Sequence, residues 1–498
     1  MASVRISEGP LGIDELLAVV DGSPVELDAS VRARIAASRD LVDRALAAGG
    51  AVYGLTTQVG HGKDTRLTDD ERLAAQLFIV RSHSGGVGPP LATPLVRAAM
   101  AVRLNGIARG GSGASLAAAD VLVAMLNAGV HPVLPSTASI GAGDLGQMAG
   151  IAQVAVGEGR AELAGEVLPG GEALRRAGIA PLVLAGRDGL ALVAANGVSV
   201  GHAALVVARA ERAAGAGDVA AALSMEATSA NPSIVHPAVA RAKGVPGQAR
   251  AADHLRELLA GSALLEPGAS RSVQDAISFR VVPQVHGAFR EQTAAARRAV
   301  TTELNAAADN PLVSLTDGLL LSNGNFHPML LALSFDALRI ALAHVGQLSE
   351  RRMAHLWASF FQNLSSGGPR PGTAYGLQLR YPAAALYSEL RHLAAPATLD
   401  TPPQDLGVED HATAAPLTVR LTDVALALLE DLLAVELLLA HDVLAGAPTR
   451  HTLGSGTTAA LRTVDQAIHT ARQAPGAAAD DIHRALRERF PGGPSRRP

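Results

Sequence analysis

The feature that most constrains the fold is a series of long apolar segments in the second half of the chain. They lie at about 190–224, 274–306, 327–356, 381–393 and 418–444. Several exceed the usual length of a helix in a globular protein. Aromatic residues make up only 3% of the chain although apolar residues make up 48%, so the core must be built from alanine, leucine and valine. That composition favours tightly packed helices over sheets.

The segment 419–444 indicates what kind of helices these are. It is apolar on nearly every side, and such a helix is buried in a large bundle or at a subunit interface. Acidic residues such as Glu430 and Glu436 interrupt it, and a membrane span tolerates such charges poorly. The sequence therefore predicts a mainly α fold with a long central helical bundle and no membrane partner.

The first part of the chain has a different pattern. Shorter helices are expected at about 31–48, 69–83, 94–108 and 114–127, and a glycine- and proline-rich stretch at 154–183 is expected to hold short strands. We therefore divide the chain into three parts. They are a mixed N-terminal part at 1–190, a long-helix bundle part at 191–490 and a disordered tail at 491–498.

Charge and cysteine content exclude several classes of partner. The 498 residues carry a net charge of -4 without long runs of one sign, which argues against nucleic acid or an anionic membrane. The chain has no cysteine, so disulfides and thiolate metal sites are impossible, and no metal is expected. Residues 1–22 carry Glu8, Asp14 and Glu15 and no long apolar core, unlike a signal peptide. We expect a cytoplasmic chain of enzyme size.

Short polar and glycine-containing motifs lie between the helices, and each has an ordinary structural explanation. The cations of Arg81-Ser82-His83 suit the end of a helix, and Asp309-Asn310-Pro311 suits a turn. None of the motifs is specific alone, but their order along the chain is. In that order they are Tyr53-Gly54, Arg81-Ser82-His83, Ser139 to Leu145, Asn196-Gly197, Gln274-Asp275 with Ser278 and Arg280, Glu303 to Leu312, Gly324 to His327, and Glu409-Asp410-His411.

This order resembles that of the histidine and aromatic amino acid ammonia-lyase family, from about Tyr53 to about Thr413. The resemblance implies a mainly α-helical fold with a central bundle of long helices, of the ammonia-lyase and fumarase type. It also implies a carbon–nitrogen lyase that acts on a small amino-acid-type substrate. Members of the family are homotetramers in which neighbouring subunits complete each site, and we expect the same here.

The resemblance also implies roles for individual residues. Tyr53 matches the tyrosine that removes the β-proton of the substrate. Arg280 matches the arginine that grips the substrate carboxylate, a task that suits its planar fork. Asn196 matches a polar residue near the reacting centre. His83 and Glu409 match positions that meet the imidazole ring in histidine-specific members, so we expect a pocket for an imidazole-like ring.

The main departure from the family lies at Gly141-Ala142-Gly143-Asp144-Leu145. The family has Gly-Ala-Ser-Gly-Asp-Leu here, and its Ala-Ser-Gly condenses into an electrophilic methylidene-imidazolone ring. In this chain the serine is absent: either Ala142 replaces it, or it is deleted before Gly143 and Asp144. Without its hydroxymethyl group nothing can dehydrate to the methylidene carbon, so no cofactor is expected.

Further departures concern the surroundings of that ring. Ile277 stands where the family has a tyrosine beside the electrophile, so two parts of one functional unit are missing together. The loop after Tyr53 gains His61 and Lys63; for Lys63 we keep open a solvated side chain, a proton donor and a contact to the substrate ring. Phe326 offers an aromatic face for a cation.

A chain without the electrophile needs a substrate that eliminates more readily than a primary amine. A quaternary ammonium departs as a neutral amine and needs no proton, so removal of the β-proton by Tyr53 could suffice. We therefore expect release of trimethylamine from a histidine-type betaine such as ergothioneine, as in ergothionase-type members of the family. The alternatives are an ordinary histidine or aromatic amino acid ammonia-lyase, a lyase for another activated amino acid, and an inactive relative that acts as a binding protein.

Overall fold

The fold is described from a computed structural model, which covers residues 2–369, 373–449, 451–471 and 474–488. The chain forms two compact units, each assembled from three segments of sequence. Unit 1 comprises 1–205, 297–333 and 397–420, and unit 2 comprises 206–296, 334–396 and 421–498. The division of the sequence at residue 190 stays a prediction. In the structure, the later segments 297–333 and 397–420 also belong to unit 1. The expected tail at 491–498 lies outside the described residues.

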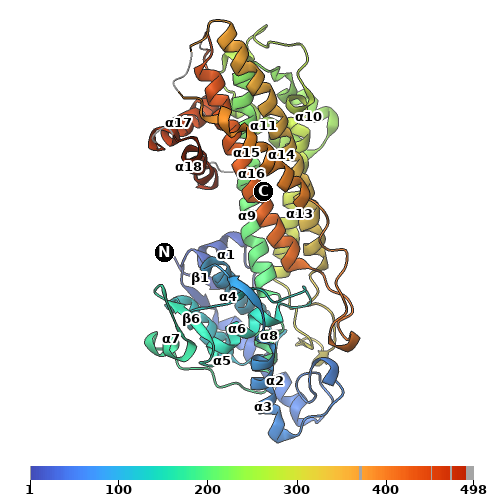
Figure 1. The fold of residues 1–498 in the computed structure, drawn as a ribbon. Helices are drawn as coiled ribbons and strands as arrows, with labels where there is room; N and C mark the ends of the chain where they lie inside the picture. Colours follow the sequence, from blue (N-terminus) through green and yellow to red (C-terminus); the bar gives the residue numbers. More distant parts are fainter. Residues whose placement is uncertain (1, 370–372, 450, 472–473, 489–498) are drawn as a thin grey trace. The chain divides into compact units, whose positions relative to one another are not determined.

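Unit 1 is a mixed α/β unit whose strands are short (Figure 1). Its strands pair as β1 with β2, β3 with β5, β4 with β6 and β7, and β8 with β9. The strands are β1 Val4–Ile6, β2 Val25–Leu27, β3 Val87–Pro90, β4 His131–Pro132, β5 Pro135–Thr137, β6 Arg160–Leu163, β7 Glu166–Pro169, β8 Leu312–Ser314 and β9 Leu319–Leu321. The helices are α1 Ile13–Val20, α2 Ala29–Ala47, η1 Gly60–Gly62, α3 Asp69–His83, α4 Thr93–Ala108, α5 Leu116–Ala128, α6 Leu145–Ala155, α7 Gly170–Arg176, α8 Asp188–Val193 and η4 Asp405–Gly407.

Helix α3 shows how the sequence fixes an element that carries a predicted site residue. Thr68 and Glu71 form a capping box at its N-terminus, which satisfies backbone donors that the first turn leaves free. The helix ends at His83, and the glycines that follow cannot continue it stably. His83 therefore lies in the last turn, as the sequence predicts.

Unit 2 is helical and centres on long helices that pack side by side (Figure 1). Arg209 of α9 pairs with Glu430 of α16 at 2.6 Å, and Arg352 of α14 pairs with Glu436 of α16 at 2.6 Å. The elements that lie wholly or mostly in unit 2 are α9 Gly197–Thr228, η2 Pro232–Val235, α10 Pro237–Lys243, α11 Pro246–Leu258, η3 Ala263–Leu265, α12 Ile277–Arg280, α13 Val282–Leu304, α14 Met329–Ser365, α15 Tyr375–Leu393, α16 Ala415–Ala445, α17 Ser455–Thr470 and α18 Pro475–Glu488. The predicted mainly α fold with a long helical bundle is confirmed.

Two of the predicted long helices are interrupted in the structure. The segment expected at 190–224 breaks between α8 and α9, because the Ala195 carbonyl accepts a hydrogen bond from Asp144 N–H at 2.7 Å instead of one within a helix. The segment expected at 274–306 begins only at Ile277 and is divided at Val281 into α12 and α13. Both breaks adjoin predicted site residues, Asn196 and Arg280.

Two stretches are long and apolar enough to cross a membrane by length and composition, Asp188–Thr228 and Met329–Ser365. In the structure, 83% and 50% of their apolar windows are buried. A core helix passes the same test, and the burial of Asp188–Thr228 fits that explanation.

Candidate active site

The altered loop keeps a tight turn although it lacks the serine. Ser139 Oγ accepts a hydrogen bond from Gly141 N–H at 3.0 Å and donates one to the Gly143 carbonyl at 2.9 Å. Gly141 and Gly143 have φ of 88° and 86°, which side chains rarely adopt. Ala142 lies between them and is partly exposed. The residues present therefore do not fit a methylidene-imidazolone, because Ala142-Gly143-Asp144 supplies the turn without a group to dehydrate.

Asp144 fastens this loop to the start of α9. Its carboxylate accepts hydrogen bonds from Ser199 N–H at 2.7 Å and from Ser199 Oγ at 2.8 Å, and Asp144 is fully buried. Burial raises the pKa of Asp144, and the hydrogen bonds from Ser199 oppose that shift. The Asp144 carboxylate thereby satisfies the Ser199 N–H, a backbone donor in the first turn of α9 that has no partner within the helix. The loop is thereby held next to Asn196, the residue before α9.

A second tie joins the altered loop to the segment that follows Glu409. Thr413 Oγ1 donates to the Gly141 carbonyl at 2.7 Å, and Ala414 N–H donates to the Ile140 carbonyl at 2.9 Å. A Cβ on Gly141 would overlap Thr413 Oγ1, so the close approach requires glycine. Two regions far apart in sequence therefore meet at the loop.

Asn196 is buried, and its amide has one free acceptor. Its Nδ2 donates to the Phe326 carbonyl at 2.8 Å, while its Oδ1 has no hydrogen-bond partner among the described residues. Phe326 is itself partly buried, and its ring meets that of His327 edge to face at 6.5 Å. Asn196 and Phe326 are thus brought together, and Asn196 Oδ1 is a buried acceptor without a partner among the described residues.

The hydroxyl of Tyr53 is held by its own loop. Gly60 N–H donates to Tyr53 Oη at 2.9 Å, which orients the oxygen and would favour its negatively charged form. Burial nevertheless raises the pKa of Tyr53, and the charges of Glu409 and Asp405 raise it further. Tyr53 therefore shares its electrostatic environment with Glu409.

His83 and Glu409 also influence each other. Burial raises the pKa of Glu409, the charge of Asp405 raises it further, and the charge of His83 lowers it. His83 Nδ1 lies 2.9 Å from the Ile79 carbonyl. Because a carbonyl only accepts, Nδ1 carries the proton in that contact and Nε2 is left for a ligand. The charge of Glu409 acts on Tyr53, and the charge of His83 acts on Glu409. These interactions indicate that Tyr53, His83 and Glu409 lie in one region of unit 1.

Of the remaining predicted residues, Lys63 belongs to the same loop as Tyr53, with its N–H 3.0 Å from the Gly60 carbonyl, whereas Arg280 and Ile277 belong to unit 2. Lys63 Nζ pairs with Asp64 at 3.2 Å, and its side chain is half exposed. Arg280 and Ile277 belong to unit 2, at the two ends of α12. Ile277 is 58% exposed, and in the described part of the chain no carboxylate forms an ion pair with Arg280. No site role of these residues is tested, and each stays a prediction.

The structure adds residues that the sequence did not single out as site residues. Asp405 pairs with His61 at 2.8 Å beside Tyr53, and Ser199 and Thr413 hold the altered loop. Of these residues, only Ser199 could have been found from the sequence. It follows Asn196 by three residues, and a serine suits the first turn of a helix that begins there. Within the described ranges, no group of three or more His, Asp and Glu side chains could hold a metal ion.

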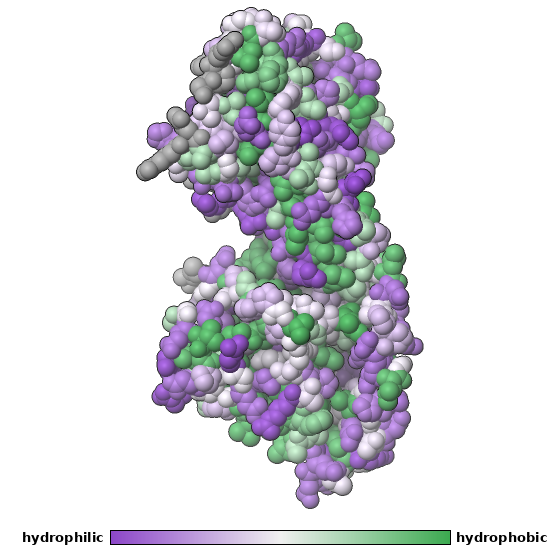
Figure 2. Space-filling view, in the orientation of Figure 1, coloured by the Kyte–Doolittle hydropathy of each residue, from purple (hydrophilic) through white to green (hydrophobic). Residues whose placement is uncertain are grey.

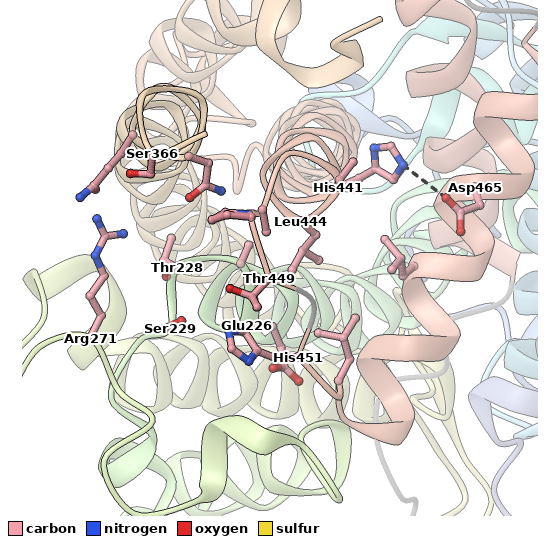
Figure 3. Close-up of a pocket in the computed structure, with 18 residues that line it drawn as sticks. Glu226, Thr228, Ser229, Arg271, Ser366, His441, Leu444, Thr449, His451 and Asp465 are labelled. Atoms are coloured by element: carbon pink, nitrogen blue, oxygen red, sulfur yellow. Dashed lines mark ion pairs between the residues drawn. The ribbon is translucent and has the colours of Figure 1, made fainter. Parts of the chain in front are cut away.

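Unit 2 contains a separate polar cavity of about 470 Å³ (Figure 3). His441 Nε2 and Asp465 form an ion pair at 3.3 Å on one side, and Arg271 points inward from the other. Glu226 at its floor is satisfied by Ser262 Oγ at 2.8 Å. None of the predicted site residues lines this cavity, so it is distinct from the group around Tyr53.

Comparison with known proteins gives consistent relatives. The family model for aromatic amino acid lyases matches residues 11–466. Histidine ammonia-lyase of Anaeromyxobacter sp. (strain K) is 39% identical over 461 residues, 89% of this chain and 90% of that protein. The solved structure of ergothionase from Treponema denticola, in complex with desmethyl-ergothioneine sulfonic acid, matches with a TM-score of 0.91 at 26% identity over 98% of this chain and 100% of that chain. Histidine ammonia-lyase from Trypanosoma cruzi matches with a TM-score of 0.84 at 30% identity over 97% of this chain and 93% of that chain.

The long helical bundle and these relatives define a carbon–nitrogen lyase. More particularly, the chain belongs to the aromatic amino acid lyase family. The resemblance found in the order of the motifs is thereby confirmed.

Proposed function

We propose that this lyase eliminates trimethylamine from a histidine-type α-amino acid betaine such as ergothioneine, without a methylidene-imidazolone group. The observation that carries the proposal is the turn at Ala142, which keeps the shape of the loop and offers no side chain that could become an electrophile. A substrate with its own good leaving group removes the need for one. The ergothionase of Treponema denticola, similar in fold over the whole chain, supports the same choice.

The elimination needs one base and a leaving group. Tyr53 Oη, as the tyrosinate, takes the β-proton of the substrate, the electrons of that C–H bond form the new carbon–carbon double bond, and the C–N bond breaks. The electron pair of the C–N bond leaves on trimethylamine, which departs neutral. The products are the conjugated acrylate and trimethylamine, and the proton remains on Tyr53.

The ring of the substrate would meet His83 and Glu409. The negative charge that develops on the β-carbon spreads into a histidine-type ring, and hydrogen-bond donors to that ring stabilise the charge and so acidify the β-proton. His83 donates from Nε2 when it is protonated, and Glu409, whose pKa is raised by burial, donates when its carboxyl carries a proton. We assign Arg280 to the substrate carboxylate, and Ile277 to the space beside the trimethylammonium.

A direct comparison of substrates tests the proposal. Purified protein is incubated with histidine, hercynine and ergothioneine under one set of conditions, with acrylate absorbance and the released amine both measured. We expect trimethylamine from at least one betaine and no ammonia from histidine. The second candidate is a histidine ammonia-lyase, which the 39% identity to histidine ammonia-lyase of Anaeromyxobacter supports. Release of ammonia from histidine at comparable efficiency would favour this candidate. No reaction with any of the three would favour another activated substrate or an inactive binding protein.

We also propose a cytoplasmic homotetramer whose sites are shared between subunits. Apolar side chains reach the surface in several separate patches (Figure 2). Tyr381, Phe361 and Leu330 on the long helices are 73%, 47% and 63% exposed. Surfaces of this kind often mark interfaces. Light scattering after size exclusion should give four chains per particle, and a monodisperse monomer at micromolar concentration would contradict the proposal.

A further inference from the structure

The loop that carries Tyr53 closes on itself through its backbone. Gly60 N–H donates to Tyr53 Oη at 2.9 Å. Gln58 N–H donates to the Thr65 carbonyl at 3.0 Å. The position of the Tyr53 hydroxyl therefore depends on where Gly60 is held.

A second loop, which leads to Glu409, has an unusual backbone at its tip. Gln404 and Glu409 pair through their backbones, with Gln404 N–H 2.8 Å from the Glu409 carbonyl. Between them, Asp405 and Leu406 have φ of 48° and 55°, a region that residues other than glycine occupy at an energetic cost. Leu406 is 90% exposed, so burial of its side chain does not offset that cost. The conformation instead turns Asp405 toward the Tyr53 loop.

The two tips meet in a contact between Asp405 and the residues Gly60 and His61. His61 Nδ1 lies 2.8 Å from Asp405 Oδ1. The other carboxylate oxygen lies so close to Gly60 Cα that a Cβ there would overlap it. Asp405 thus touches both the residue that orients Tyr53 Oη and the residue next to it.

We infer that His61 and Asp405 form a latch that holds the Tyr53 loop against the Glu409 loop. The pair is formed by positioning residues, which touch neither the reacting atoms nor the substrate. The latch fixes the distance between the proposed base and the carboxylate proposed to bind the substrate ring. Correct placement of a base contributes strongly to the rate, because small displacements lower the fraction of productive complexes. This kinetic consequence rests on the proposed function, whereas the contact itself does not.

The latch should act on the loops and leave global stability unchanged. The His61 side chain is 68% exposed and that of Asp405 is 26% exposed. Surface ion pairs contribute little to global stability because water and salt screen them. Removal of the latch should therefore leave Tm unchanged and accelerate amide hydrogen exchange in residues 54–66 and 404–409.

The experiment compares His61→Ala, His61→Asn, Asp405→Ala and the double variant His61→Ala/Asp405→Ala in the full chain. An asparagine amide can replace the donor Nδ1, so His61→Asn should keep wild-type exchange rates. With ergothioneine, kcat/KM should fall about tenfold in His61→Ala and recover to within about threefold in His61→Asn. The double variant should be no worse than the poorer single variant. Asp43→Ala, which removes the surface pair between Arg39 and Asp43 on α2, is the matched control.

The exchange measurement needs no substrate and so separates the latch from the proposed function. If the wild-type protein converts none of the three substrates, the proposed function fails while the exchange rates still decide on the latch. Exchange in both loops equal to wild type in His61→Ala and Asp405→Ala would overturn it. Additive losses of kcat/KM in the double variant would overturn it as well.

Discussion

Arg103 and Asp309 form a buried ion pair at 2.7 Å, in which the two side chains are 3% and 1% exposed. Glu303, which lines the same small cavity as Arg103, receives no hydrogen bond to its carboxyl from any described residue. Arg103 is thus committed to Asp309, and Glu303 is partly buried with no cation partner among the described residues. Burial raises the pKa of Glu303 to about 7.

This arrangement predicts a specific dependence of stability on pH. The folded pKa of Glu303 lies above its ordinary value of 4.5, so the folded state binds more protons between these values. The contribution of Glu303 is therefore fully present below about pH 4.5 and is lost as pH rises through about 7, by about 3 kcal/mol in total. Denaturant unfolding of Glu303→Gln should show a weaker fall of the unfolding free energy across this window. An identical pH dependence in the variant and the wild type would contradict the assignment.

A second prediction concerns the mass of the chain. Because no serine stands between Gly141 and Asp144, the loop cannot lose the water that ring formation releases. Intact-protein mass spectrometry should give the mass of the unmodified chain. A mass deficit that corresponds to the loss of water and maps to the peptide containing Ala142 would contradict this interpretation.

A third prediction concerns the base. Tyr53→Phe removes only the oxygen that accepts the proton, so turnover of the true substrate should fall about 10³-fold with an unchanged Tm. Because a base must be deprotonated and the pKa of Tyr53 is raised from 10.0, kcat/KM of the wild type should increase with pH through the alkaline range. Tyr387→Phe, at a partly buried tyrosine on α15, is the control and should keep full activity. Near-native turnover of Tyr53→Phe would mean that another group is the base.

A fourth prediction concerns the carboxylate of the substrate. Arg280→Lys replaces a planar fork with a point charge, so KM should rise roughly tenfold while kcat changes less. Steady-state kinetics with the betaine measures both parameters. Arg298→Lys, at an exposed position on α13, is the matched control. An unchanged KM in Arg280→Lys would assign carboxylate binding elsewhere.

A fifth prediction concerns the room for the leaving group. Ile277→Tyr restores the aromatic side chain of the family but not its electrophile, so it should lower kcat/KM for the betaine by crowding and should not create activity on histidine. Val239→Tyr, on α10, controls for an added surface tyrosine. Ammonia release from histidine by Ile277→Tyr would show that the missing serine is not what excludes primary amines.

Helix positions were the most predictable part of the structure. Helix α3 occupies Asp69–His83 as expected, since its cap and the glycines after it are local signals. The breaks at Asn196 and Val281 were not predicted from the apolar pattern. The break at Asn196 adjoins a contact distant in sequence, the hydrogen bond from Asp144 N–H to the Ala195 carbonyl.

The sequence by itself determined the family, the helical class and the absence of the serine, because the order of the motifs and the residue at 142 are properties of the chain alone. Tertiary structure decided which of the predicted residues act on one another. The charges of Glu409 and Asp405 reach Tyr53 only because loops about 350 residues apart in sequence meet in space. It also decided that Glu303 has no cation partner among the described residues, and that Asp405 meets His61. Such pairings depend on side-chain directions and burial, which no local pattern of residues encodes.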